Sequence, residues 1–359
     1  MARAILLSPH PSALHVRVEA CAVYDFLAAL FVVHRHGRGL AFDVADAWVE
    51  RARRGLGQRS LRDLDLLSCE RGTLLSLVAL LDRRAVDDTV AGFVGHVREV
   101  PADELVLTLL ASARAARPVR QHLREALRTR GVAREAALAR FAAGLPQELR
   151  PEAAVELARM DPQAVRDRLV RLLTRFHERV YAGEEPRVLP LLRADAERKR
   201  RRAQHLSPQA FVEEATGGHV LDPTQVTEVV VVPSYFVRPF NLIADHVGVR
   251  TYVVPLGEDE SVGEPTEVVV RVAKALGDET RLRILRMLMD REMYTQQVAE
   301  ALGTSHVTAI HHLAALRAAH LIRIVERQNL KFYVLRPEGL QEALGVLSRF
   351  LRPGASPAS

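Results

Sequence analysis

Two adjacent histidines, His311 and His312, are the residues of this chain whose type could most directly carry chemistry. Imidazole can bind a metal, transfer a proton or contact a partner outside the protein. The pair lies in GTSHVTAIHHLAALRAAHL, residues 303–321, whose apolar spacing is typical of an amphipathic helix. Successive residues of a helix point about 100° apart, so the two rings do not converge on one ion as an i, i+4 pair does. We therefore predict no metal here.

A helix-turn-helix pattern surrounds the histidines. The segment TQQVAEAL ends at Gly303, a short turn follows, and Ser305 is placed to cap a second helix. Ala309, Leu313 and Leu316 recur at spacings of four and three, which predicts that they point inward. The opposite face would enter a major groove, where an isoleucine suits a thymine methyl. The predicted DNA-binding residues of this helix are the capping Ser305 and the outward-facing His306, Val307, Thr308, Ile310 and His311.

The segment after this helix predicts a basic hairpin. IRIVERQNLKFYVL contains two β-prone runs around a polar Gln328-Asn329 turn. Arg323, Arg327 and Lys331 are spread along it and would neutralise phosphates, which adds salt-dependent affinity rather than sequence choice. A hairpin beside a recognition helix is a wing, and we predict that His312 packs half-buried beneath it.

The distribution of charge agrees with a polyanionic partner at the C-terminus. From residue 266 onward the sequence contains 13 Lys and Arg and 9 Asp and Glu, a net charge of +4, whereas the other 265 residues carry a net charge of only +2. No apolar run reaches the roughly 18 residues of a membrane span, and the N-terminus lacks a signal-peptide pattern, so we expect a cytoplasmic protein without membrane contact. Cys21 and Cys69 have no metal or disulfide spacing.

The chain, at 359 residues, is long enough for two or three domains. We predict a mainly α fold: a helical domain over residues 1–256 with a small β-sheet, then a winged helix-turn-helix over 266–351. GGHVL, TEVVVVPSYFVRPF and RTYVVPLGE place the short strands at about 219–256, with Val229 to Val232 buried on both faces. The acidic, glycine-containing stretch 257–265 is the predicted linker, and the tail 352–359 is predicted to be disordered.

Residues 268 to 350 resemble the ArsR-type winged-helix repressors of bacteria. Three motifs carry the resemblance in the right order: AKALGDETRLRILRML, VAEALGTSHVTAIHHLAALRAAHLI and RQNLKFYVL. It implies a dimer paired through the first and last helices, here about 266–276 and 338–351. It also implies DNA contacts from His306, Val307, Ile310 and His311. Metal-sensing members carry a cysteine pair in the helix matching EMYTQQVAEAL, or Asp and His ligands in the last helix. This chain has neither, so we expect no metal and no cofactor.

Two further clusters leave alternatives open. The run DAERKRRRAQH, residues 195–205, is typical of a solvated helix face, although it could touch DNA beside the site. Tyr235, Phe236 and Phe240 form either an aromatic plug over the sheet, or a pocket mouth or interface with the winged domain. Trp48 is predicted to belong to the core.

The function that we predict is a dimeric bacterial transcription regulator that binds double-stranded operator DNA. A small-molecule effector or a partner would act at the N-terminal domain. We predict no enzyme, because no Ser/His/Asp, metal or nucleotide constellation is present in the sequence. The alternatives are an enzyme in the N-terminal domain with an appended winged helix, and a protein-interaction module.

Overall fold

A four-stranded sheet lies at the centre of the N-terminal domain, in the order β1 (His15–Val18), β3 (Glu228–Ser234), β5 (Val249–Pro255) and β4 (Leu242–His246). The first three strands are parallel, and β4 runs antiparallel to β5. The computed structural model describes residues 14–38, 40, 42–68, 73–81, 89–110, 117–145, 151–222, 226–246, 248–257, 265–327 and 330–351. We did not predict β1, because four residues with alternating polarity give too short a pattern to recognise.

The middle strand β3 is buried on both faces, as its valine run predicts. Val229, Val230, Val231 and Val232 are all fully buried. Val230 and Val232 belong to the large helical core, whereas Val229 and Val231 pack in a smaller cluster with Phe211. Parallel strands covered on both sides read as continuous apolar runs, which is the pattern seen here.

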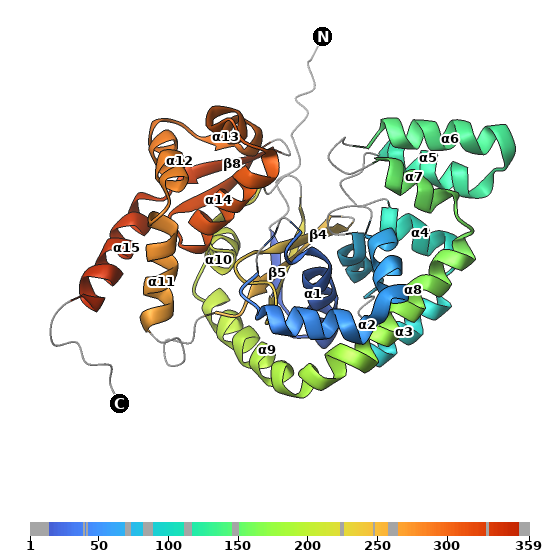
Figure 1. The fold of residues 1–359 in the computed structure, drawn as a ribbon, viewed down its shortest axis with the longest axis horizontal. Coiled ribbons are helices and arrows are strands. Elements are labelled where there is room, and N and C mark those ends of the chain that lie inside the picture. Colours follow the sequence, from blue (N-terminus) through green and yellow to red (C-terminus); the bar gives the residue numbers. More distant parts are fainter. Residues whose placement is uncertain are drawn as a thin grey trace, which may run out of the picture.

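Helices surround this sheet in an arc, with α5 to α7 at one tip and the C-terminal domain at the other (Figure 1). Their bounds are α1 (Ala22–Arg35), α2 (Asp46–Leu67), η1 (Thr73–Leu80), α3 (Val90–Glu99), α4 (Ala102–Leu110), α5 (Arg117–Arg128), α6 (Gly131–Ala143), α7 (Pro151–Arg159), α8 (Pro162–Phe176), the π-helical turn η3 (His177–Tyr181), α9 (Ala182–Ala203) and α10 (Pro208–Ala215). Asp161 caps α8 through a bond from the Ala164 amide, with Pro162 in the first turn. Among the helices of the described ranges, none combines the length and apolarity that crossing a bilayer needs.

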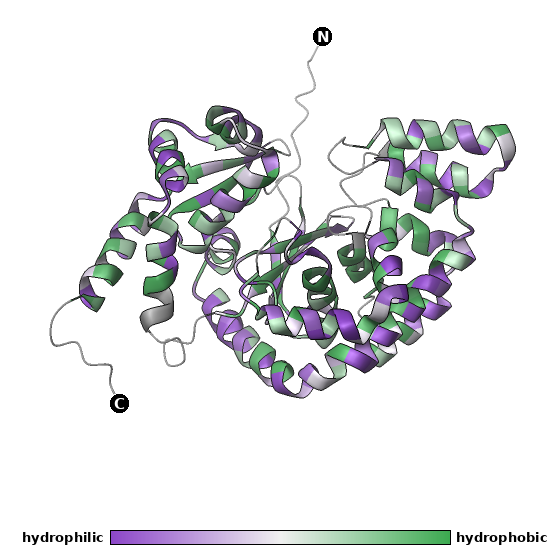
Figure 2. Ribbon diagram, in the orientation of Figure 1, coloured by the Kyte–Doolittle hydropathy of each residue, from purple (hydrophilic) through white to green (hydrophobic). Residues whose placement is uncertain are grey.

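The helix α1, which is mostly apolar (Figure 2), packs against this sheet. It contains one buried carboxylate, Asp25. Asp25 accepts hydrogen bonds from the Ser234 hydroxyl at 2.6 Å, the Tyr235 amide at 2.8 Å and the Tyr181 hydroxyl at 3.0 Å. Burial opposes ionisation more strongly than these three donors favour it, and raises the pKa of Asp25 from 3.8 to about 6. The carboxylate thereby ties α1 to the end of β3 and to η3.

We expect this carboxyl to make stability fall as pH rises from about 4 to 6. Its folded pKa lies above the unfolded one, so its stabilising contribution is complete below pH 3.8 and is lost as pH passes 6. The loss amounts to about 3 kcal/mol. The Asp25→Asn variant should lack this slope, because the amide does not titrate and Tyr181 can still donate to the Ala22 carbonyl. Urea unfolding between pH 4 and 7 measures the difference.

The control for this experiment is Asp43→Asn, which changes an exposed carboxylate in the connection before α2. It should leave the wild-type slope unchanged. Equal slopes in wild type and Asp25→Asn would contradict the assignment to Asp25.

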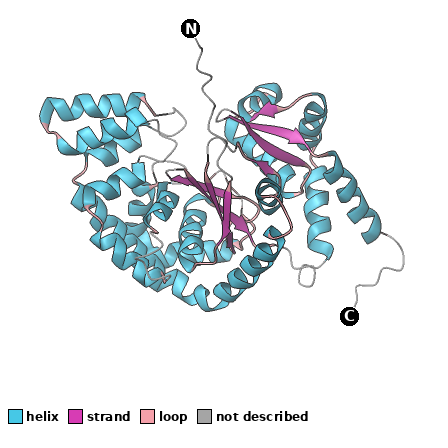
Figure 3. Cartoon of the chain, turned by 180° about the vertical axis from the view of Figure 1, so that it is seen from behind, coloured by secondary structure: helices cyan, strands magenta, loops and turns pink. Residues whose placement is uncertain are grey.

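The C-terminal domain contains a helical layer and a second sheet, seen separately from the central sheet in Figure 3. Its helices are α11 (Pro265–Leu276), α12 (Glu279–Asp290), α13 (Thr295–Leu302), α14 (His306–Ala318) and α15 (Pro337–Phe350). The sheet has the order β2 (His219–Val220), β7 (Ile322–Arg327), β8 (Leu330–Leu335) and β6 (Met293–Tyr294). This is the winged-helix arrangement that the sequence predicts.

The position of β2 corrects one prediction. We expected GGHVL to join the sheet of the N-terminal domain, but His219 and Val220 pair in parallel with Ile324 and Val325 of β7. The N-terminal domain therefore supplies an edge strand to the winged-helix sheet. The sequence could not show this, because two residues carry no pattern that identifies their partner. Residues 258–264 of the predicted linker, the Gln328-Asn329 turn and the tail 352–359 lie outside the described residues.

Candidate nucleic-acid interface

The turn of the helix-turn-helix is built by one glycine and one serine. Gly303 ends α13 in the left-handed conformation, with φ of +63°, which a residue without Cβ adopts at little cost. Ser305 then caps α14, accepting a hydrogen bond from the Thr308 amide at 3.1 Å. Both features were predicted from the sequence and are confirmed. They fix where α14 begins and therefore which residues stand in its first turn.

The inner face of α14 is sealed. Ala309, Leu313 and Leu316 are fully buried in a cluster with Ile284 of α12 and Val298 of α13. This confirms the face predicted from their spacing. Burying this stripe fixes the rotation of the helix about its axis, so the opposite residues must face outward.

The outer face of α14 carries the predicted DNA-facing set. Ser305 and Thr308 are exposed, and Val307 is 38% exposed. The half-buried members are His306, Ile310 and His311. Burial, followed by the neighbouring His312, lowers the pKa of His311. Its ring is therefore neutral at pH 7 and offers one donor and one acceptor.

His312 is half-buried, as predicted. Its Nδ1 lies 3.6 Å from the Asp278 carboxylate. Asp278 itself caps α12 by accepting from the Arg281 amide at 2.9 Å. The ring thus lies beside the start of α12, and its packing beneath the wing stays a prediction.

The three cations predicted for the wing lie in different settings. Arg327 is exposed near the end of β7, where it pairs with Glu292 and lies 6.0 Å from the Phe332 ring. Lys331 is half-buried on β8. Arg323 forms an ion pair at 3.2 Å with Glu213 of α10. Its guanidinium is thus engaged with the N-terminal domain.

A buried ionic network joins the wing to the N-terminal domain. The Arg250 guanidinium of β5 donates a hydrogen bond to the Glu326 carboxylate of β7, and its Nε donates to Asp245 at 2.6 Å. Both Arg250 and Glu326 are nearly inaccessible to solvent. The sequence did not predict the link between the domains, because Arg250 and Glu326 lie 76 residues apart. The sequence feature that could have indicated the network is Glu326, an acidic residue within the basic hairpin.

Two glycines allow this close contact between the domains. Gly217 and Gly218 have φ of +66° and +99°. A Cβ on Gly218 would lie 2.8 Å from Cβ of Arg323, and the Gly218 carbonyl accepts from the Ile324 amide at 2.7 Å. The Gly-Gly pair thus lets β2 reach the edge of β7.

An apolar surface remains on the outer helices of the C-terminal domain. Helices α11 and α15 lie side by side away from the central sheet (Figure 1). Exposed apolar side chains on this pair and at its end are Val270, Leu344, Phe350 and Leu351. We call these four residues the outer apolar surface. Within the described part of the chain, no cluster of three or more His, Cys, Asp or Glu residues could hold a metal ion.

Comparison with known proteins agrees with this geometry. Residues 278–323 match the family described as bacterial regulatory protein, arsR family. The transcriptional regulator KmtR of Mycobacterium tuberculosis is 35% identical over 86 residues, 24% of this chain and 66% of that protein. The regulator CmtR of Mycobacterium bovis is 35% identical over 79 residues, 22% of this chain and 67% of that protein. No solved structure was found to match the chain.

A third relative is matched over nearly its whole length. The transcriptional repressor SdpR of Bacillus subtilis is 30% identical over 83 residues, which are 23% of this chain and 92% of that protein. Its length corresponds to the C-terminal domain alone. Through that domain, the chain belongs to the ArsR family of bacterial regulatory proteins.

Proposed function

We propose that this chain regulates transcription by binding operator DNA through α14 and the wing. The observation that carries the proposal is the orientation of α14, whose inner face is sealed while its first turns face outward. A helix held in this way can enter a major groove with its N-terminal residues against base edges. The matched relatives are named as transcriptional regulators or a repressor, which supports the same role.

Within this proposal the residues of α14 divide by chemistry. Ser305 and Thr308 stand at the N-terminus, where backbone amides and the helix dipole favour a phosphate. The bases would be read by His306, Val307, Ile310 and His311, with Ile310 against a thymine methyl. The neutral ring of His311 suits a base edge, which presents both donors and acceptors.

Selection of genomic fragments bound by the full chain tests the function. We expect recovered fragments to share half-sites about one helical turn apart, roughly 34 Å, which is the spacing that a symmetric dimer reads. Repeating the selection with cell extract tests for an effector. Fragments without any shared sequence would overturn the operator-binding proposal and would favour the protein-interaction alternative.

The wing should supply phosphate contacts through two cations. We expect Arg327→Ala combined with Lys331→Ala to weaken operator binding and to reduce the slope of log affinity against log salt by about 2. Arg327 would exchange its exposed pair with Glu292 for a phosphate at small cost, because exposed ion pairs contribute little. Titrations at several salt concentrations measure the slope, and Arg349→Ala on α15 is the control. An unchanged slope would remove the wing from the interface.

We further propose that the outer apolar surface pairs two copies of the chain. Leu344 and Leu351 are 54% and 74% exposed, and exposed apolar side chains on neighbouring helices are typical of interfaces. We expect Leu344→Lys to convert a dimer to a monomer in sedimentation velocity, since a buried lysine without a partner is costly. Met289→Lys is the matched control, because Met289 is exposed on α12 outside this surface. A monomeric wild type would contradict the proposed dimer.

A further inference from the structure

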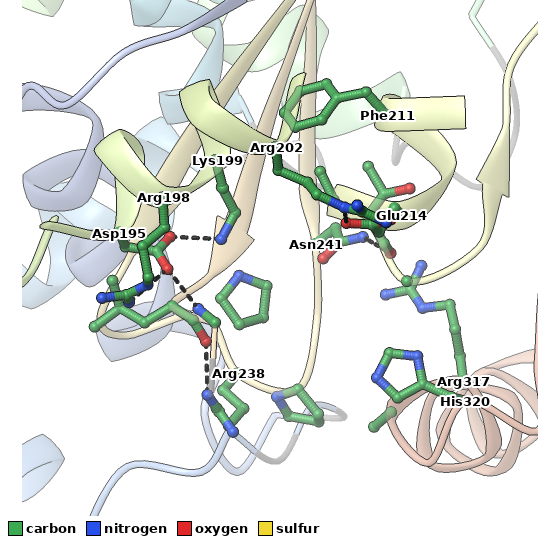
Figure 4. Close-up of a pocket in the computed structure, with 18 of the residues that line it drawn as sticks. Asp195, Arg198, Lys199, Arg202, Phe211, Glu214, Arg238, Asn241, Arg317 and His320 are labelled. Atoms are coloured by element: carbon green, nitrogen blue, oxygen red, sulfur yellow. Dashed lines mark hydrogen bonds and ion pairs between the residues drawn. The ribbon is translucent and has the colours of Figure 1, made fainter. Parts of the chain in front are cut away.

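A pocket of about 510 Å³ lies between the two domains. One wall comes from α9, α10, the β3–β4 connection and the end of β5, and the other from α11 and the C-terminal end of α14. Figure 4 shows Arg198, Lys199 and Arg202 on the α9 side and Arg317 and His320 on the α14 side. The volume is in the range of sites for small metabolites.

The charges of the lining residues are strongly unbalanced. Among the described residues, two carboxylates line the pocket, and both have cationic partners within it. Asp195 accepts from Lys199 at 2.5 Å and from Arg198 at 3.0 Å, and Glu214 forms a bidentate pair with Arg202 at 2.7 and 2.8 Å. Against these two acids stand six cations, namely Arg198, Lys199, Arg202, Arg238, Arg271 and Arg317. The described lining residues therefore carry a net charge of about four positive units.

Arg317 is the cation whose setting most clearly suggests a ligand. It extends from α14 toward the side of the pocket that carries Glu214 and Asn241 (Figure 4). Among the described residues, no carboxylate forms an ion pair with it. Burial lowers the pKa of its guanidinium, so the described part of the chain holds a half-buried cation without a carboxylate partner. An anion bound in the pocket would supply that charge.

We propose that this pocket binds a small organic polyanion, carrying at least two negative charges on phosphate or carboxylate groups, which acts as an effector. The effector role rests on the proposed DNA-binding function, whereas the binding site itself does not. Guanidinium groups bind both kinds of anion through paired hydrogen bonds, and cations from both domains line the pocket. A bound anion would therefore bridge the two domains.

The position of Arg317 connects the pocket to the DNA-facing residues. Arg317 and His311 are six residues apart on α14, which corresponds to about 9 Å along the helix axis. An anion that holds Arg317 against Arg238 of the N-terminal domain stabilises one placement of α14 relative to that domain. Any difference in anion affinity between the free and DNA-bound states then changes operator affinity by the same factor.

Calorimetric titration of the DNA-free full chain tests the site. The probes are inorganic pyrophosphate and citrate at constant ionic strength, which separate phosphate from carboxylate recognition. We expect at least one probe to bind with a sub-millimolar Kd, and Arg317→Gln and Arg238→Gln each to weaken it at least tenfold. Arg201→Gln should have no effect, because Arg201 belongs to the same basic run but is 63% exposed and lies outside the pocket.

Two results would overturn the site: absence of binding by both probes, or an equal loss in Arg201→Gln, which would indicate diffuse charge screening. Thermal melts show whether the variants fold. We expect Arg317→Gln to raise the melting temperature of the ligand-free protein, since it removes an uncompensated cation. The bound probe should then raise the melting temperature of the wild type and not that of this variant.

The effector role is tested separately, by operator titrations with and without the probe that binds. We expect the probe to change the operator affinity of the wild type beyond a chloride control, and to have no such effect on Arg238→Gln. Binding of the probe without this change would overturn the effector role and leave the site. Failure of the probe-free protein to bind operator would instead contradict the proposed function, whatever the calorimetry shows.

Discussion

Replacing Glu326 with alanine is expected to lower the free energy of unfolding by about 3 kcal/mol. The substitution leaves the Arg250 guanidinium buried at the contact between β5 and β7 without its partner on the wing. The expected cost lies at the lower end for breaking a buried ion pair, because Asp245 remains 2.6 Å from Arg250. Urea unfolding measures the change. Amide exchange should also become faster in β2 and β7, where the domains share one sheet.

Two further variants separate the ion pair from general effects of substitution. Glu300→Ala removes an exposed carboxylate of α13 and should change stability by less than about 0.5 kcal/mol. The double variant Arg250→Met with Glu326→Leu removes both buried charges and should recover most of the loss. If Glu326→Ala costs no more than Glu300→Ala, the pair does not hold the domains together.

The contact that Glu326 makes is the part of the structure that the sequence could not predict. Helix α14 was predictable because its capping serine, its apolar stripe and the glycine that ends the preceding helix α13 all lie within about 20 consecutive residues. Arg250, Glu326 and the strand β2 come together from distant parts of the chain, and none has a local pattern that identifies its partner. Arg323 also has a partner that the sequence does not indicate. The hairpin pattern predicted that it binds DNA, whereas in the structure it forms an ion pair with Glu213.

The sequence left two interpretations open for the aromatic segment 235–240 and for the basic run 195–205, and the packing of these segments in the structure distinguishes between them. Phe236 stacks on Trp48 with ring centroids 4.6 Å apart, so the aromatic segment does plug the core. Yet Arg238 of the same segment lines the interdomain pocket. The basic run divides likewise: Lys199 faces Asp195 in the pocket, while Arg201 is exposed. A helix face can be located from spacing, but the neighbour that covers it depends on the tertiary fold.

Two single substitutions on α14 should have opposite consequences, because the residues occupy opposite faces. Leu313→Ala removes a fully buried side chain and should destabilise the C-terminal domain by about 2–5 kcal/mol. Ile310→Ala removes a half-buried side chain of the outer face and should leave the melting temperature nearly unchanged. In operator titrations, however, Ile310→Ala should weaken binding by about 1–3 kcal/mol, or roughly 5- to 150-fold, at sites that place a thymine methyl against it.

Sequence selection on the Ile310→Ala protein distinguishes base contact from a general loss of affinity. A lost methyl contact relaxes the preference for thymine at one position of each half-site and leaves the other positions unchanged, since mismatches at separate positions act almost independently. The salt slope should also stay constant, because isoleucine neutralises no phosphate. If Ile310→Ala instead unfolds the domain, or weakens all sequences equally, then α14 does not read DNA through this face.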